Sequence, residues 1–312
     1  MIRTAVLLAL LVSQAARADT GFVTSQEAGT VALVDIARAT VLRVTQVGGK
    51  PAAVAVDPAR ARAYVVSPES AMLNVLDTDG ALLRQIAVAG GPFGVAVNPA
   101  QGLVYVSDWY GARIHEIDPE AGQVLRSFAV GASPAGLAVT ADGTRLISAD
   151  RDDDQISILD TATGQVLAQV KVGRHPFGVT LHAGRAFTAD VESDSVSVVD
   201  LASARLVATI AVGKRPYALA FAAGKGFVTN QYEDTVSVFD ATSFAPLASI
   251  EVGEYPEGIA SAEGGQRIVV ANWFSNTLSL IDPANLSVMA EVAVPDGPRA
   301  FGDFVLPALR AP

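Results

Sequence analysis

The sequence predicts an all-β protein, a seven-bladed β-propeller with four antiparallel strands per blade and a last blade closed by strands from both termini. Three observations predict it: a repeat of 40 to 42 residues, four strand-like segments in each repeat, and a C-terminal segment that completes a repeat begun at the N-terminus. Repeats of about 40 residues that each supply four strands are typical of propeller blades.

The first marker of the repeat is an Asp that ends the third strand-like segment. Its copies are 40 to 42 positions apart along the whole chain after the N-terminal segment. An Asp side chain at this place favours a turn, because it accepts hydrogen bonds from the backbone that follows it. We therefore interpret these residues as structural. They are Asp35, Asp77, Asp118, Asp160, Asp200, Asp240 and Asp282.

A Pro in the loop between repeats keeps the same spacing, and the residue two positions after it is always Gly or Ala. The first strand of a blade lies nearest the axis, where seven backbones crowd together. Small residues there indicate close packing and not a phosphate-binding loop. The Pro residues are Pro51, Pro92, Pro134, Pro176, Pro216, Pro256 and Pro298.

Each repeat contains four short alternating segments of strand length. Residues 54–56 typify the first, 64–66 the second, 196–199 the third and 206–210 the fourth. They are rich in β-branched residues and are separated by Gly, Asp and Pro turns, as strands of an antiparallel sheet are.

The two ends of the repeat array complement each other. After Pro298 only one strand remains, residues 301–306, while residues 21–24, 31–34 and 41–44 supply a second, third and fourth strand without a first. Joining the two sets in one blade closes the ring and removes its open edges.

Residues 1–18 are predicted to be a secretory signal peptide. A basic residue precedes the apolar run 5–12, and small residues stand before a cleavage position at Ala18. The run is too short to span a bilayer, so we expect no stable membrane insertion. The alternative is a membrane anchor or a buried helix. Cleavage leaves residues 19–312 as a single propeller domain, which we expect in the periplasm or secreted.

The amino-acid composition excludes cysteine-dependent chemistry and disfavours some classes of partner. The chain has no Cys, which excludes disulfides, a thiolate nucleophile, iron–sulfur ligands and covalent haem attachment. A net charge of -10 disfavours nucleic acid and anionic lipid as general partners. No cofactor is predicted, and the expected state is a monomer.

The segment 227–230, Phe-Val-Thr-Asn, and the segment 22–25, Phe-Val-Thr-Ser, look like variants of the YVTN motif, each followed by a third strand of alternating type. The mature chain thus resembles the YVTN-family seven-bladed β-propeller repeat proteins of the exported bacterial type. The resemblance implies a binding or scaffolding role, and more distant relatives imply lactonase or lyase activity. Fold alone does not decide between them.

The loops between second and third strands are expected on the same face as the loops between blades, over the central channel, where function usually lies. Large rings occur in these polar loops, which favours a platform for a ligand or partner. The alternative is that each ring packs on the neighbouring blade. The predicted binding residues are Lys50, Trp109, Tyr110, Arg151, Glu192, Tyr232, Tyr255, Trp273 and Phe274.

Cations near the repeat Pro could form a ring that selects a small anionic ligand or a peptide carboxylate. The alternative is dispersed ion pairing with Asp152, Glu192 and Glu257. The cations are Lys50, Arg151, Arg174, Arg215 and Arg299.

Metal binding has one candidate, a calcium site. Asp150, Asp152 and Asp154 alternate as calcium ligands do, but a central Gly and a distal Glu are missing. The first polar residue of each second-to-third-strand loop is interpreted as a turn residue that bonds to nearby backbone. These residues are Ser25, Ser67, Asp108, Asp150, Asp190, Asn230 and Asn272.

Three functions remain open. The leading hypothesis is a non-catalytic binding or scaffold protein that holds a small ligand, a peptide or a periplasmic partner protein at the channel mouth. The alternative is a lactonase- or lyase-type enzyme with His175 as base and Arg215 or Arg299 stabilising an oxyanion. The third is an accessory of a periplasmic oxidoreductase system.

Overall fold

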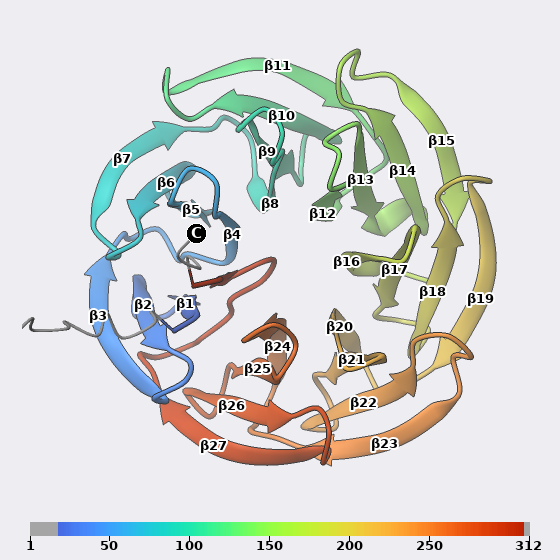
Figure 1. The fold of residues 1–312 in the computed structure, drawn as a ribbon. Helices are drawn as coiled ribbons and strands as arrows, with labels where there is room; N and C mark the ends of the chain where they lie inside the picture. Colours follow the sequence, from blue (N-terminus) through green and yellow to red (C-terminus); the bar gives the residue numbers. More distant parts are fainter. Residues whose placement is uncertain (1–17, 309–312) are drawn as a thin grey trace, which may run out of the picture.

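Seven four-stranded antiparallel sheets surround a central axis in the computed structural model, which describes residues 18–308 (Figure 1). The predicted seven-bladed propeller is therefore confirmed. The predicted signal peptide lies outside the described residues, apart from its last residue, Ala18. No helix in the part of the chain that the structure describes is long and apolar enough to cross a membrane.

The first and second strands of each blade form its inner half. The first strands are β4 (Ala53–Asp57), β8 (Pro92–Val97), β12 (Pro134–Val139), β16 (Pro176–His182), β20 (Pro216–Ala222), β24 (Pro256–Ala262) and β28 (Val305–Leu306). The second strands are β5 (Arg62–Ser67), β9 (Val104–Asp108), β13 (Arg145–Asp150), β17 (Arg185–Asp190), β21 (Lys225–Asn230), β25 (Arg267–Asn272) and β1 (Thr20–Ser25).

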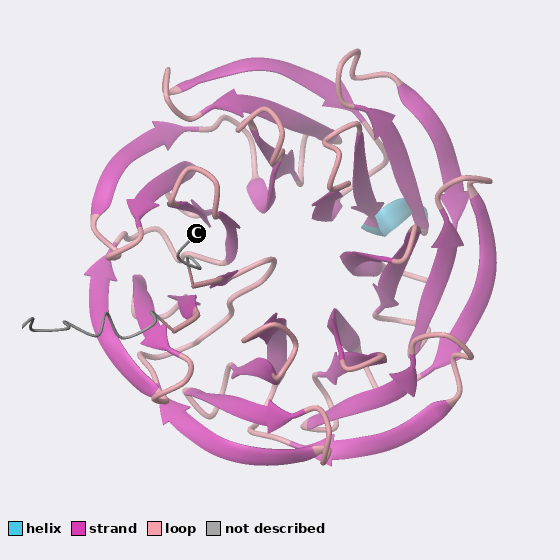
Figure 2. Cartoon of the chain, in the orientation of Figure 1, coloured by secondary structure: helices cyan, strands magenta, loops and turns pink. Residues whose placement is uncertain are grey.

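The third and fourth strands form the outer half, and strands and loops make up nearly all of the described chain (Figure 2). A short 3-10 helix covers Arg151–Asp153. The third strands are β2 (Thr30–Asp35), β6 (Met72–Asp77), β10 (Arg113–Asp118), β14 (Gln155–Asp160), β18 (Ser195–Asp200), β22 (Thr235–Asp240) and β26 (Thr277–Asp282). The fourth strands are β3 (Thr40–Gln46), β7 (Leu82–Ala87), β11 (Gln123–Ala129), β15 (Val166–Lys171), β19 (Arg205–Ala211), β23 (Pro246–Glu251) and β27 (Ser287–Ala293).

The ring closes as predicted, in a sheet of order β28-β1-β2-β3. The regular part of the closing strand is shorter than predicted, because only Val305 and Leu306 are strand. Upstream of them the tail turns to the next blade: the N–H of Val54 donates to the carbonyl of Phe301 at 2.8 Å, and that of Val56 to Asp303 at 3.0 Å. The tail thus joins two blades, the closing sheet β28-β1-β2-β3 and the neighbouring sheet β4-β5-β6-β7, instead of completing the closing sheet alone.

The core lies between neighbouring blades. Second and third strands are buried on both faces, whereas the fourth strands expose most of their residues at the rim. The small residue of each first strand allows the close approach that the sequence predicted. A Cβ on Gly178 would lie 2.5 Å from the carbonyl oxygen of Tyr217 in the next blade. The close-packing interpretation is confirmed at this position.

The Asp that ends each third strand holds the following turn, as predicted. The backbone N–H and the hydroxyl of Ser243 donate to Asp240 at 2.7 and 2.9 Å, and the N–H of Thr242 donates at 3.0 Å. These bonds favour the ionised carboxylate and lower the pKa of Asp240. The residue is a turn anchor and not a chemical site.

The first polar residue of the next loop has different partners from those predicted. Asp190 is buried and accepts hydrogen bonds from the hydroxyls of Thr188, Ser195 and Ser197 on β17 and β18, and from the backbone N–H of Gly173 in the inter-blade loop, none of which belongs to the turn after β17. The prediction of a bond to the turn backbone is wrong for this residue. The partners differ because the carboxylate is buried, and a buried carboxylate needs hydrogen-bond donors close to it in the interior. Asp108 behaves as predicted and accepts from the N–H of Gly111 at 3.0 Å.

Candidate functional site

Two sets of loops share one face of the ring, as the sequence predicted. In six of the seven blades the first residue after the second strand donates its N–H to the carbonyl of the residue before the repeat Pro: Val191 to His175 at 3.1 Å and Trp273 to Tyr255 at 3.0 Å. In the seventh, Pro68 follows β5 and Glu69 donates to the Gly49 carbonyl at 3.1 Å. His175 and Tyr255 have φ values of 52° and 57°, in the left-handed region that non-glycine residues enter at a cost. We call this surface the loop face.

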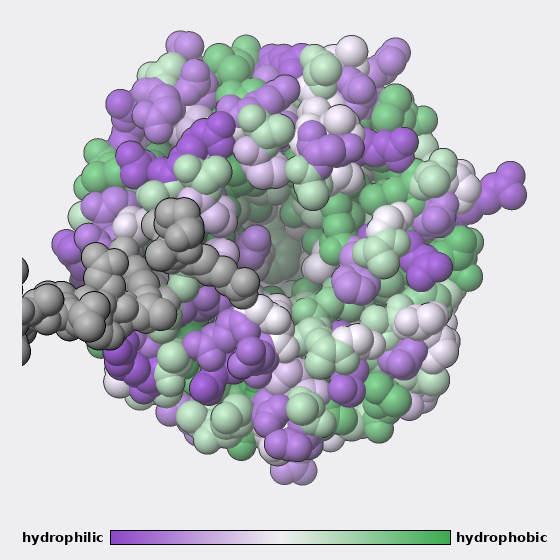
Figure 3. Space-filling view, viewed as in Figure 1, coloured by the Kyte–Doolittle hydropathy of each residue, from purple (hydrophilic) through white to green (hydrophobic). Residues whose placement is uncertain are grey.

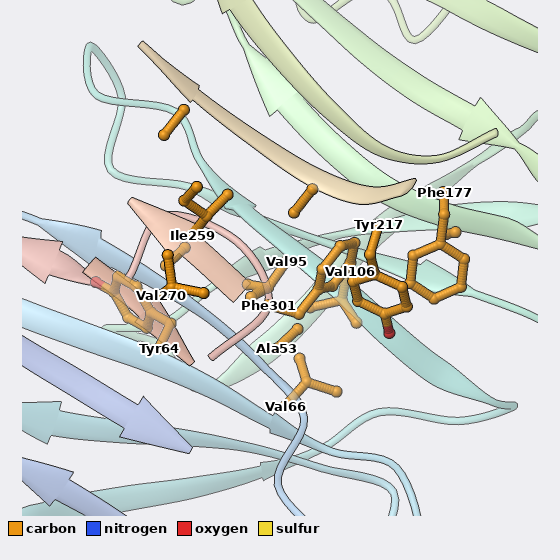
Figure 4. Close-up of a cluster of buried hydrophobic side chains, with 14 of the residues drawn as sticks. Ala53, Tyr64, Val66, Val95, Val106, Phe177, Tyr217, Ile259, Val270 and Phe301 are labelled. Atoms are coloured by element: carbon orange, nitrogen blue, oxygen red, sulfur yellow. The ribbon is translucent and has the colours of Figure 1, made fainter. Parts of the chain in front are cut away.

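Beneath the loop face, aromatic side chains pack across the axis. The rings of Phe177 and Tyr217 lie 4.3 Å apart, and Phe301 lies 5.1 Å from Phe177 and 5.5 Å from Tyr217 (Figure 4). Phe93 completes the layer, at 5.4 Å from Phe177, and Trp109 contacts Phe93 at 5.1 Å. Trp109 therefore packs onto this layer, against Phe93 of its own blade.

Arg299 is bound into the same layer. Its Nε lies 2.8 Å from Oε2 of Glu257 and donates to the Tyr217 hydroxyl at 3.1 Å, while the guanidinium lies 5.6 Å from the centre of the Phe93 ring. Gln231 donates to the other oxygen of Glu257 at 2.9 Å. Burial raises the pKa of Glu257 to about 7, against the opposing effect of Arg299. Arg299 thus links first-strand segments from several blades.

His175 and Arg215 share one carboxylate. Oε1 of Glu192 lies 3.2 Å from Nδ1 of His175 and 3.4 Å from Nη1 of Arg215. Arg174 donates to the Glu192 backbone carbonyl at 2.6 Å. The predicted residues His175, Glu192 and Arg215 therefore come together, and the imidazole is partly exposed beside the Glu192 carboxylate. A carboxylate-paired imidazole can transfer protons, and it can equally serve as an ion-paired surface group.

The remaining predicted cations are paired separately. Lys50 lies 3.9 Å from Glu27, and Arg151 binds its neighbour Asp152 and lies 5.6 Å from the ring centre of Trp109. The arrangement is dispersed ion pairing around the channel mouth, which was the alternative to a free cationic ring.

The three calcium candidates bind different protein groups. Asp150 is buried and accepts from the hydroxyls of Ser148 and Ser157, while Asp154 accepts from the backbone N–H of His175. Asp152 pairs with Arg151, as described above. Within residues 18–308 no group of three or more His, Asp or Glu side chains is placed to hold a metal ion.

Four of the predicted rings form one exposed surface. Tyr255 lies 5.8 Å from Tyr232, 5.9 Å from Trp273 and 4.9 Å from Phe274, and the last two lie 4.6 Å apart. Tyr232 is 60% exposed and Phe274 58%. Arg215 stacks on Tyr232, with its guanidinium 5.4 Å from the ring centre. We call these four rings the aromatic ledge. Tyr110, 86% exposed, stands apart in a loop of another blade.

One indole group of the ledge lacks a partner. Nε1 of Trp273 is buried and has no hydrogen-bond acceptor among the described residues. A buried N–H without an acceptor is costly.

Sequence reasoning missed an axial cavity on the opposite side of the aromatic layer. It has a volume of about 550 Å³ and includes Phe301 and Asp303 in its wall. The space-filling view shows a central hollow whose border is hydrophobic in part (Figure 3). Asp303 could have been found in the sequence, because it is the one charged residue at the fifth position after the repeat Pro.

Comparisons with known proteins agree with this architecture. The family model of the YNCE-like beta-propeller matches residues 9–186, more than half of the chain. A functionally unknown protein from Desulfotomaculum acetoxidans superposes with a TM-score of 0.78 at 13% identity, over 90% of this chain and 98% of the other. Kuenenia stuttgartiensis hydrazine synthase gives 0.72 at 16% identity, over 81% and 89%. A comparison with curated proteins finds no significant match.

At these identities the two structural likenesses establish the fold alone. The family model covers enough of the chain to establish kinship. The chain belongs to the YNCE-like β-propeller family.

Proposed function

We propose that the protein is exported and is a non-catalytic binding propeller that docks an extended segment of a partner protein across the aromatic ledge. The observation that carries the proposal is the continuity of the four rings. They come from the loops of two neighbouring blades, touch one another, and still leave Tyr232 and Phe274 more than half exposed. An exposed cluster of large rings on a soluble domain marks an interaction surface.

The chemistry of the ledge suits a peptide segment. Tyr and Trp provide large apolar area with little loss of side-chain entropy, and they dominate binding energy at protein interfaces. Arg215, stacked on Tyr232, would face acidic side chains or a terminal carboxylate.

The test compares two variants that each remove exposed rings from the loop face. The double variant Tyr232→Ala/Phe274→Ala trims the ledge, and Tyr110→Ala trims an isolated ring in another blade as the matched control. Each protein captures partners from an envelope extract of its own host, and bound proteins are quantified by mass spectrometry. We expect a partner that the control retains and the double variant loses by about tenfold or more, the scale of two interface hot spots. Equal recovery of partners by the wild type, the double variant and the Tyr110→Ala control contradicts the proposal.

A second candidate function is favoured by the contact between His175 and Glu192. The carboxylate orients an imidazole that could act as the base of a lactonase- or lyase-type reaction, with Arg215 beside a developing oxyanion. Arg299 is less suited to that role, since Glu257 and Tyr217 already bind its guanidinium. Activity in a lactone or lyase screen that disappears in His175→Ala would favour this alternative. The role as an oxidoreductase accessory stays a prediction.

A further inference from the structure

The axial cavity is enclosed by the first strands of the blades and lies apart from the aromatic ledge. At its inner end stands Phe301, whose ring also contacts the aromatic layer through Phe93 at 5.9 Å and Phe177 at 5.1 Å. The layer therefore separates the cavity from the loop face. A volume of about 550 Å³ is within the range of small-molecule sites, roughly 300–1,000 Å³.

The wall of the cavity follows the repeat. The residue five positions after each repeat Pro lines it in all seven blades, and six of these seven residues are uncharged. The seventh is an aspartate. In blade order the residues are Val56, Val97, Val139, Leu181, Phe221, Ser261 and Asp303.

The backbone holds Asp303 at this position. Its carbonyl accepts the N–H of Val56 at 3.0 Å, and the preceding Gly302, with φ of 110°, packs so closely that a Cβ would lie 2.5 Å from the Val54 carbonyl oxygen. Its side chain is exposed to the cavity and has no hydrogen bond or ion pair with residues 18–308. The apolar side chains around the cavity partly desolvate the carboxylate and raise the pKa of Asp303 to about 6.

The other two titratable residues of the wall are differently placed. Asp57 is buried and its carboxylate binds Nη1 of Arg60 at 3.1 Å, so that charge is already matched. His182 stacks on Phe221, with the ring centres 4.2 Å apart. Asp303 is thus an anion without a counter-ion among residues 18–308 in a mostly apolar wall, and a cation that entered the cavity would pair with it.

We propose that this cavity binds a small organic cation, a protonated or quaternary amine with apolar substituents, whose charge pairs with Asp303 while its hydrocarbon part contacts the valine and leucine wall. A divalent metal ion fits less well, because calcium and magnesium require several oxygen ligands and Asp303 offers one carboxylate. The acidic protein as a whole also raises the local concentration of cations.

The experiment uses three probes of one shape and different charge: benzylammonium, benzyl alcohol and benzoate. Binding to the full chain is measured by titration calorimetry at pH 8, where Asp303 is ionised, with Asp303→Asn, Asp303→Glu and Glu251→Gln as variants. Glu251→Gln is the matched control, since it removes one negative charge from an exposed position on the rim strand β23.

We expect benzylammonium to bind about tenfold or more tightly than benzyl alcohol, and benzoate to bind most weakly. A tenfold difference in affinity is the size of effect that one charge-assisted hydrogen bond produces. Asp303→Asn abolishes that preference, while Asp303→Glu and Glu251→Gln retain it. Benzylammonium affinity falls as the pH drops through about 6, because Asp303 then becomes protonated. Equal affinities for the three probes, an unchanged preference in Asp303→Asn, or no saturable binding up to about 10 mM overturns the proposal. Trimming the ledge leaves all of these results unchanged.

Discussion

Replacing Asp190 by Asn is expected to stabilise the protein, although it removes a charge that three hydroxyls bind. Burial raises the pKa of Asp190 from 3.8 to about 6, and the bonds from Ser197, Thr188 and Ser195 only partly oppose that effect. The folded protein therefore binds a proton more tightly than the unfolded chain does. Because of this difference, stability falls as the pH rises from about 4 through 6.

The size of the effect follows from the two pKa values. A change from 3.8 to about 6 corresponds to about 3 kcal/mol of folding free energy that is lost once the carboxylate is ionised. Two neighbouring blades already contain the substitution. Asn230 donates from Nδ2 to Thr235 and Ser237 at 3.0 and 2.9 Å, the same register that Ser195 and Ser197 occupy around Asp190. An Asn at position 190 can thus satisfy the same hydroxyls.

Urea unfolding of the wild type and Asp190→Asn, followed by circular dichroism at pH 4 and pH 8, measures the difference. We expect near-equal stabilities at pH 4 and a variant more stable by about 3 kcal/mol at pH 8. Asp200→Asn is the control, and its expected effect on stability has the opposite sign. Turn hydrogen bonds lower the pKa of Asp200, so removing this carboxylate should destabilise the protein at pH 8. A gain at position 190 that is the same at both pH values, or a loss at pH 8, refutes the reasoning.

Two further predictions concern the axis. Gly178→Ala should cost about 1–3 kcal/mol in urea unfolding, because its Cβ would lie 2.5 Å from the Tyr217 carbonyl oxygen; a variant as stable as the wild type contradicts the close approach. Arg299→Ala should cost about 3–5 kcal/mol, since it leaves Glu257 buried without its counter-ion, and adding Glu257→Gln should recover part of the loss. No recovery in that double variant, measured by the same unfolding, would mean that the ion pair is not what stabilises this layer.

Most of the fold could be predicted because its signals are local and repeated. A turn Asp, an inter-blade Pro and alternating apolar residues recur in every blade, so each repeat confirms the others. The closing tail was predicted less completely. Its path between β1 and β4 depends on Gly302 and on bonds to Val54 and Val56, which lie about 250 positions away in the sequence.

The candidate site was predicted in part. The sequence placed the residues of the aromatic ledge on one face, because loops of equal register in adjacent blades lie side by side. It could not separate Trp109, which packs on the inner aromatic layer, from Trp273, which occupies the same loop position in another blade. The difference arises from the neighbouring side chains, because Trp109 lies beside Phe93 and Trp273 lies beside Tyr255.

The sequence by itself determined the number of blades, the strands of each and the face that carries the loops, since these follow from hydrogen-bonding and burial patterns within 40 residues. Only the tertiary structure decided which side chains meet at the axis. Arg299 meets Glu257 and Tyr217, and Asp303 meets no partner within residues 18–308, because the curvature of the ring sets distances between blades that no local pattern encodes.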